Sequence, residues 1–139
     1  MTKYSDTLKT SHGIEVIELF KGPVFTFGNL LGAEVKEGNG EYRVGIPMKG
    51  LFYLPFEIVF YTRRFASERK VSYIAYSPDL TRNRWGSLQI AYENKTLNIN
   101  LEIEFPFEPI SSLILERRIK KSLKNLEEII RIEKIKRKI

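Results

Sequence analysis

The sequence predicts an α+β domain in which an antiparallel sheet of six or seven strands wraps around one long C-terminal helix. The spacing of apolar residues changes twice along the 139 residues. From Ala33 onward, apolar and polar side chains alternate with a period of two, which is typical of strands. From Pro109 to Ile139 there is no Gly and no further Pro, and apolar residues recur three or four apart, which predicts an amphipathic helix over 109–137. With 42% hydrophobic residues, the chain is expected to fold as a single domain over 1–139.

The N-terminal part is predicted to form one strand and two short helices. Residues 3–10 alternate weakly and form the first strand. Ser11 offers an N-cap for a helix over 14–20, which the following Gly-Pro pair ends. Pro23 suits the first position of a second helix, over 23–31, because its fixed backbone angle is already helical and the missing N–H has no partner there.

Turns rich in Gly, Asn, Pro and Ser divide the middle of the chain into further strands. The predicted strands span 33–37, 41–47, 51–65, 70–76, 84–93 and 96–107. The last alternates most clearly, with Leu97, Ile99 and Leu101 on one face and Asn98 and Asn100 on the other. One buried face and one wet face are typical of antiparallel sheets.

Loop lengths predict which residues lie opposite each other and therefore which share the inner face. We assign a two-residue turn at 94–95, a three-residue loop at 48–50 with Gly50 in the left-handed conformation, and a four-residue turn at 66–69. These loops predict the pairs Tyr92–Leu97, Ile90–Ile99, Ile46–Phe52, Val44–Leu54, Phe60–Ala75 and Thr62–Tyr73.

The net charge of +6 lies entirely on the last helix. Residues 116–139 hold ten Lys or Arg and four Glu, whereas residues 1–115 hold thirteen of each sign. On a helical wheel the apolar stripe is formed by Leu115, Ile119, Leu123, Leu126 and Ile130. The opposite side carries Arg117, Lys120, Lys121, Lys124 and Arg131. Such a basic side is either a solvated face or a surface for anionic lipid or nucleic acid.

Composition excludes several classes of site. With no Cys and one His, neither a disulfide nor a transition-metal centre is expected, and no nucleotide-binding or nucleophile-elbow motif occurs. We therefore expect no cofactor and no metal. The N-terminus lacks the apolar core of a signal peptide, no apolar run reaches membrane length, and the absence of Cys fits a reducing cytoplasm, which is the expected location. The abundance of Ile, Lys and Glu resembles the usage of heat-adapted proteins.

The order of these elements resembles a known superfamily. The segments that carry the resemblance are TSHGIEVIELF, then GPVFTFGNLLG, then the hairpins from AEV to FPF, and last EPISSLILERRIKKSL. Over essentially the whole chain they resemble the helix-grip fold of the START and Bet v 1-like (SRPBCC) superfamily, and we place the chain in an archaeal branch of it. Some members carry several glycines after the second strand, whereas this chain has only Gly38-Asn39-Gly40.

The resemblance implies a hydrophobic cavity between sheet and helix that holds lipids, sterols, hormones or polyketides, and a minority of members are enzymes. The register and the helical wheel predict its walls, and apolar walls would supply affinity. The predicted ligand-binding residues are Phe27, Leu31, Phe56, Ile58, Thr62, Tyr73, Leu88, Ile90, Tyr92, Leu101, Ile103, Leu115, Ile119 and Leu123. Thr62, Tyr73 and Tyr92 would orient a polar end of the ligand. The alternative is that the same residues meet and fill the core.

The expected function is non-catalytic binding or carrying of a small hydrophobic molecule. An alternative is a cyclase, dehydratase or hydrolase that uses the same cavity. It needs an ionisable group inside, and Glu57, Asp6 and Arg64 are the candidates. A triad of Ser11, His12 and Asp6 has nothing to orient it, because the three are near neighbours in the sequence. The pair Glu102 and Glu104 lies on the solvated face of its strand.

The last turns of the helix predict a partner. Ile132, Ile135 and Ile139 lie off the apolar stripe, on the outward side of the wheel. Exposed isoleucines leave apolar surface in water, at a cost of about 25 cal/mol per Å². We therefore expect either a frayed end or a homodimer through this segment. Nucleic acid is not an expected partner, because the body of the protein is neutral.

Overall fold

The computed structural model of the protein describes residues 1–48 and 56–139. In these residues the chain forms seven strands and four helices. The strands are β1 (Thr2–Lys9), β2 (Glu34–Gly38), β3 (Glu41–Met48), β4 (Phe56–Ala66), β5 (Lys70–Tyr76), β6 (Arg84–Glu93) and β7 (Thr96–Ile103). The helices are α1 (Val16–Phe20), α2 (Pro23–Leu31), α3 (Ile110–Lys124) and α4 (Leu126–Arg137). The α+β class and the order of elements are confirmed.

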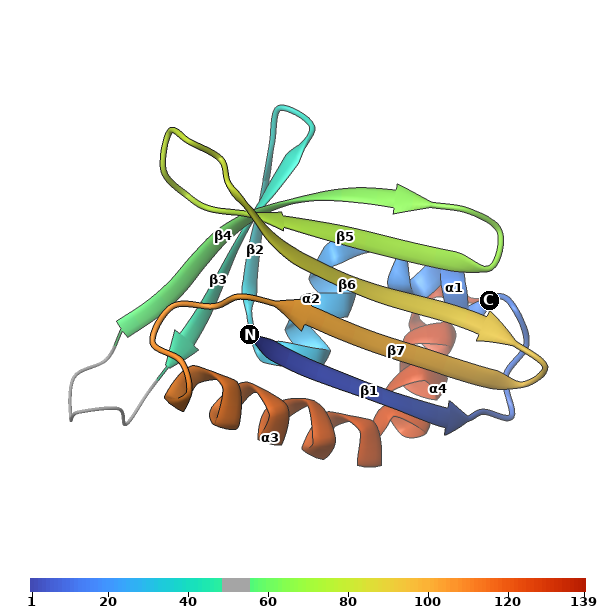
Figure 1. Cartoon of the computed structure of the whole chain (residues 1–139). Helices are drawn as coiled ribbons and strands as arrows, with labels where there is room; N and C mark the ends of the chain where they lie inside the picture. Colours follow the sequence, from blue (N-terminus) through green and yellow to red (C-terminus); the bar gives the residue numbers. More distant parts are fainter. Residues whose placement is uncertain (49–55) are drawn as a thin grey trace.

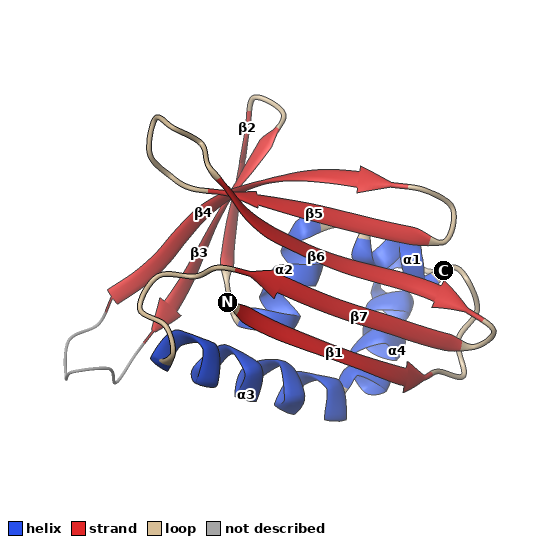
Figure 2. Cartoon of the chain, viewed as in Figure 1, coloured by secondary structure: helices blue, strands red, loops and turns tan. Residues whose placement is uncertain are grey.

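The strands form one antiparallel sheet in the order β1-β7-β6-β5-β4-β3-β2. In Figure 1, β5, β6, β7 and β1 run side by side, and the second half of β4 lies along β5. The first half of β4 turns away together with β3 and β2, so the sheet is strongly curved. Figure 2 shows α1, α2 and α4 behind this sheet and α3 along the side of β1. The helices therefore cover the inner face and one edge of the sheet, and they leave its outer face to solvent.

The hairpins fix the same inner face that the alternation predicts. Tyr92 lies opposite Leu97 and Ile90 opposite Ile99, as expected for a two-residue turn. The burial of β7 alternates along its whole length, with Leu97 and Ile99 buried and Asn98 exposed. One face of β7 thus packs on the core and the other meets water.

Two other registers are wrong, each by an even number of residues. Phe60 and Thr62 were expected opposite Ala75 and Tyr73, but Thr62 lies opposite Ala75. The reason is that the turn spans 67–70 instead of 66–69, and Ala66 pairs with Val71. An even shift leaves every side chain on its predicted face.

The β3–β4 hairpin also differs from its predicted register. Ile46 lies opposite Ile58 and Val44 opposite Phe60, so each pair is shifted by six residues along β4 from the predicted one. The expected partners Phe52 and Leu54, the loop 48–50 beyond Met48, and the start of the strand predicted over 51–65 lie outside the described residues. The end of that strand, at Ala66, agrees to within one residue.

The C-terminal helix is not continuous, contrary to the prediction of one helix over 109–137. It breaks at Asn125, whose backbone angles φ −109° and ψ 3° leave the helical region. The Asn125 N–H donates to Ser122 O (3.1 Å), three residues back instead of four. Asn is a weak helix former because its side chain competes for backbone hydrogen bonds. The break lets α3 pack beside α2 and β1 while α4 packs against α1.

Other boundaries shift by a few residues. The first helix begins at Val16 and not at residue 14, and Ser11 does not cap it, because Glu15 holds the N-cap position without a side-chain hydrogen bond. The last strand ends at Ile103 and not at 107. Phe105 nonetheless stays buried beyond the end of β7.

The side chain of Arg118, in α3, forms hydrogen bonds to α2 and to β3. The guanidinium of Arg118 donates to the carbonyl oxygens of Leu31 (3.2 Å), at the end of α2, and Pro47 (2.6 Å), in β3. Burial lowers the pKa of Arg118. These two bonds hold the helix across the junction between α2 and the sheet.

Candidate functional site

The predicted ligand-binding residues gather on the inner face of the sheet and on the sides of α2 and α3 that face it. Apart from Phe56, which is half-buried, they are all buried. They are Phe27, Leu31, Ile58, Thr62, Tyr73, Leu88, Ile90, Tyr92, Leu101, Ile103, Leu115, Ile119 and Leu123. Their common location follows from the alternation and the helical stripe. That they bind a ligand stays a prediction.

Aromatic rings from three elements meet at the centre of this region. The ring centroids of Phe27 and Tyr73 lie 5.0 Å apart, and those of Phe27 and Phe60 lie 5.9 Å apart. Phe60 also packs edge-on against Phe105, at 5.8 Å. Edge-to-face contacts at these separations are favourable. The centre of the inner face is therefore lined by mutually packed rings.

The three hydroxyls that were expected to orient a ligand have different surroundings. The hydroxyl of Tyr73 donates to Phe20 O, and burial raises the pKa of Tyr73 to about 12. The hydroxyl of Tyr92 donates to the carbonyl oxygen of His12 (3.2 Å). The Oγ1 of Thr62, with the side chain fully buried, has no hydrogen-bond partner among the described residues.

A groove lies where α3 meets the edge strand β1. One hollow of about 480 Å³ is lined by Tyr4, Asp6, Leu8, Lys120, Leu123 and Lys124. A neighbouring hollow of about 420 Å³ is lined by Lys3, Tyr4, Ser5, Leu113, Glu116, Arg117 and Lys120. Of the predicted ligand-binding residues, only Leu123 lines either hollow. Sequence analysis did not find the β1 side of the groove, because nothing in the sequence shows that α3 packs beside the first strand.

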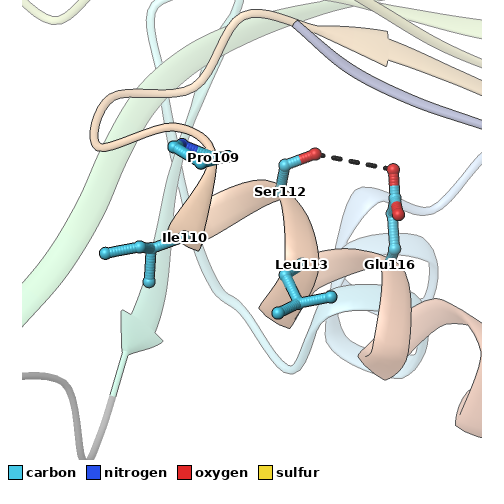
Figure 3. A pocket seen from close by; sticks show the side chains of 5 residues that line it. All are labelled: Pro109, Ile110, Ser112, Leu113 and Glu116. Carbon is cyan, nitrogen blue, oxygen red and sulfur yellow. Dashed lines mark hydrogen bonds between the residues drawn. The ribbon is translucent and has the colours of Figure 1, made fainter.

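The groove continues to the first turn of α3. A hollow of about 350 Å³ is lined there by Pro109, Ile110, Ser112, Leu113 and Glu116 (Figure 3). The hydroxyl of Ser112 donates to Glu116 Oε1 (3.5 Å), while Ile110 and Leu113 extend away from this pair (Figure 3). Ile110 and Leu113 are 41% and 53% exposed, so this end of the groove presents apolar surface to solvent.

The rim of the groove is basic. Arg117, Lys120 and Lys124 lie along α3 and make no ion pair with any described residue. On the other side the hydroxyl of Tyr4 donates to Asp6 Oδ2 (2.9 Å). Burial, and then this hydrogen bond, raise the pKa of Tyr4 to about 12. The groove lining therefore combines three leucines with an excess of basic over acidic side chains, because Lys3, Arg117, Lys120 and Lys124 outnumber Asp6 and Glu116.

The candidate catalytic groups are not brought together. Glu57 points to the outer face, where its carboxylate covers Gly45 and pairs with Arg43 (3.3 Å). Arg64 donates to the backbone oxygen of Lys21 at the surface. Asp6 is exposed on β1 and is the only one of the three candidates that lines the groove described above.

Ser11 and His12, which were considered with Asp6 as a catalytic triad, likewise contact other residues. The Ser11 hydroxyl donates to Glu127 Oε2 (3.0 Å) in α4. Burial would raise the pKa of Glu127, but hydrogen bonding by Thr10 and Ser11 lowers it overall. The Nδ1 of His12 lies 3.2 Å from Lys134 Nζ, and the His12 side chain is half-buried. The contacts of Ser11 and His12 therefore hold α4 against the segment that follows β1.

No helix of the described residues has both the length and the apolar character needed to cross a bilayer. A comparison with curated proteins finds no match. Solved structures do resemble the chain. One is the crystal structure of DR_A0006 from Deinococcus radiodurans, with a TM-score of 0.61, 6% identity, and coverage of 91% of this chain and 95% of that one.

A second solved structure gives the same result. The X-ray structure of protein MLL2253 from Mesorhizobium loti has a TM-score of 0.59 and 12% identity, and the match covers 92% of this chain and 96% of that one. Both were structural genomics targets, and at these identities the likeness shows the fold alone. A protein-family model, whose description reads only "-like", matches residues 1–139. Because this match covers the whole chain, the protein belongs to that family.

Proposed function

We propose that this protein is a helix-grip domain of the START and Bet v 1-like type, and that it binds or carries a small hydrophobic molecule without transforming it. The order of elements and the sheet order β1-β7-β6-β5-β4-β3-β2 support the fold assignment. The ligand would lie between the inner face of the sheet and α3.

The observation that carries the proposal is the hydroxyl of Thr62. It is fully buried and finds no hydrogen-bond partner within the described residues. Burying a hydroxyl without a partner costs free energy, and proteins rarely do so without a reason. A polar group at the end of a bound ligand would supply the missing partner.

The groove beside β1 provides the opening for such a ligand. Its hollows lie along the surface junction of α3 and β1, and Leu123 belongs both to one hollow and to the buried stripe of α3. The Arg118 bonds to Leu31 and Pro47 would limit how far α3 moves away from the sheet. The basic rim would hold an anionic end of a ligand before the apolar part enters.

Native mass spectrometry of the full chain tests the proposal directly. A co-purified adduct of a few hundred daltons, released on denaturation, is the expected result. Displacement of a fluorescent fatty acid then measures affinity in two matched variants. Thr62→Val should weaken binding roughly fivefold, the effect of one lost hydrogen bond, and Thr7→Val, on the exposed side of β1, should leave it unchanged. The absence of both an adduct and probe binding would contradict the proposal.

A second candidate function is binding to an anionic surface through α3. The observation that favours it is the row formed by Arg117, Lys120, Lys121 and Lys124, none of which pairs with a carboxylate among the described residues. Sedimentation with phosphatidylserine vesicles should then fall steeply between low and moderate salt. No sedimentation at low salt would rule this function out.

We also propose a homodimer through α4. Ile132, Ile135 and Ile139 are 43%, 63% and 54% exposed, so the structure of a single chain leaves this apolar row in water. Like charges nearby would oppose pairing, but Lys134 bonds to Glu15 and Arg137 to Glu133 within the chain. The intramolecular pairs reduce the repulsion that a second copy would meet.

A further inference from the structure

The outer face of the sheet carries a cluster of arginines and tyrosines that the function above does not use. Tyr61 of β4 and Tyr76 of β5 lie directly opposite each other. The guanidinium carbon of Arg82 lies 3.9 Å from the ring centroid of Tyr61, and that of Arg63 lies 5.7 Å from the ring centroid of Tyr76. Both arginines therefore stack against tyrosine rings on the solvent side of the sheet.

Two hollows adjoin this cluster and share one wall. The first, of about 320 Å³, is lined by Lys36, Glu37, Gly38, Asn39, Glu41, Arg43, Tyr61 and Arg82. The second, of about 260 Å³, is lined by Glu41, Arg63, Tyr76 and Arg82. Because Arg82 and Glu41 line both, a movement of the Arg82 side chain would join the hollows and uncover the ring of Tyr61. The first hollow alone is at the lower end of the size range of small-ligand sites, and the two joined fall well within it.

Arg63 and Arg82 make only long contacts to their shared carboxylate, whereas Arg43 pairs with Glu57 at 3.3 Å. Glu41 lies between two guanidiniums, 3.6 Å from Arg63 Nε and 3.8 Å from Arg82 NH2. Both distances exceed those of a hydrogen bond. Lys36, Arg43, Arg63 and Arg82 in the lining outnumber Glu37 and Glu41. N–H donors thus remain available for an added oxyanion, in surroundings with an excess of positive charge.

The loop that carries Arg82 is preformed. Ser77 N–H donates to Asn83 O (2.7 Å), and Asn83 N–H donates to Ser77 Oγ (2.9 Å). Asp79 Oδ1 accepts bonds from the Ser77 hydroxyl (2.9 Å) and the Thr81 N–H (3.0 Å). These bonds close the loop between β5 and β6 and place Arg82 over the sheet without help from a ligand.

We propose that this cluster is a binding site for a phosphorylated nucleobase, with the base stacked on Tyr61 in place of the Arg82 guanidinium and the phosphate held by Arg43, Arg63 and Arg82. A purely apolar ligand would have no use for the guanidiniums, and a simple anion would have none for the ring. A base with a phosphate uses both, because bases stack on aromatic side chains and phosphate accepts paired N–H bonds from arginine. The source is either a free mononucleotide or a single-stranded oligonucleotide.

Calorimetric titration of the full chain with AMP, adenosine, inorganic phosphate and an eight-residue single-stranded oligonucleotide tests the site. AMP should bind more tightly than either adenosine or phosphate, and less tightly at higher salt. Tyr61→Val should weaken AMP binding at least fivefold, and Arg63→Gln and Arg82→Gln should do the same. Arg69→Gln, an exposed arginine in the β4–β5 turn, is the charge-matched control and should bind as the parent does.

The outcomes separate the two sources. Equal affinity for AMP and for each site on the oligonucleotide supports a free nucleotide, and at least tenfold tighter binding of the oligonucleotide supports a strand. If neither binds at millimolar concentration, or if Tyr61→Val binds AMP as the parent does, the proposal is wrong. Thermal melting confirms that each variant is folded, and the two arginine variants keep the test valid if Tyr61→Val does not fold.

Discussion

The ammonium group of Lys134, near the end of α4, lies 2.6 Å from Oε1 of Glu15, the residue that precedes α1. The two residues are 119 positions apart in the sequence. The same carboxylate oxygen accepts the Gly13 N–H (3.1 Å), so one side chain orders both the turn before α1 and the last turns of α4. This contact joins the last turns of α4 to the segment before α1, and packing of this kind stabilises helix ends.

The Lys134–Glu15 contact predicts a pH-dependent stability. The hydrogen bond from Lys134, together with backbone bonds, lowers the pKa of Glu15 from 4.5 to about 2. A lowered pKa in the folded state means stabilisation that is present above about pH 5 and lost as the pH falls toward 2. Glu15→Gln should cost about 1 kcal/mol at pH 7, after allowance for solvent screening, and almost nothing at pH 2.

Urea denaturation of the parent and the Glu15→Gln variant at pH 7 and at low pH measures this difference. Glu68→Gln, in the exposed turn between β4 and β5, is the control and should be neutral at every pH. A difference between parent and Glu15→Gln that stays constant with pH would show that the Lys134 contact does not set the pKa of Glu15.

Two buried threonines should respond to the same substitution with opposite signs. Thr62→Val removes a hydroxyl without a partner among the described residues and should raise the free energy of unfolding of the ligand-free protein by about 1 kcal/mol. The Thr26 hydroxyl lies 2.8 Å from Phe20 O and 2.9 Å from Gly22 O, so Thr26→Val should lower it by about 1–2 kcal/mol. Chemical denaturation of ligand-free protein measures both. A loss of stability in Thr62→Val would mean that the hydroxyl has a partner.

Two glycines should also differ in their tolerance of alanine. Gly86 has φ +145°, and a Cβ there would lie 1.9 Å from the backbone oxygen of Glu102, which cannot move away without breaking the β6–β7 pairing. Gly86→Ala should therefore cost more than about 2 kcal/mol. A Cβ on Gly28, inside α2, would meet nothing closer than Ala33 O at 3.8 Å. Gly28→Ala should stabilise by about 0.5–1 kcal/mol, and equal melting temperatures of the two variants would contradict this account.

The exposed isoleucines of α4 predict self-association. Sedimentation at high micromolar concentration should show a dimer for the parent and a monomer for Ile135→Lys, because a buried ammonium would oppose the interface. Leu80→Lys is the control, since Leu80 is fully exposed in a loop away from α4 and should not affect assembly. A truncation at Arg131 would also remove the Lys134–Glu15 contact, so the point variant is the cleaner test. A parent that runs as a monomer would contradict the dimer.

The sequence was sufficient to predict which face of a strand or helix is buried, because this depends only on the periodicity of that element. The alternation of β7 and the stripe of Leu115, Ile119 and Leu123 place these side chains inside whatever the exact pairing is, because the period of the element alone decides which face a residue takes. For this reason the residues predicted for the inner face were correct even though two of the predicted strand registers were wrong. The loop lengths were less predictable, since a turn that shifts by one position, as at 67–70, moves every pair but no face.

The amino-acid sequence is thus enough to predict the α+β class, the order of elements and the face of the sheet on which the described strand residues lie. The packing of distant elements, by contrast, brings α3 and β1 together to form a groove and places Arg82 on the ring of Tyr61. Each of these depends on where another element comes to rest, and residues that meet across tens of positions leave no periodic signal in the chain. The buried hydroxyl of Thr62 is of this second kind, because only the surrounding fold shows whether a partner lies within reach.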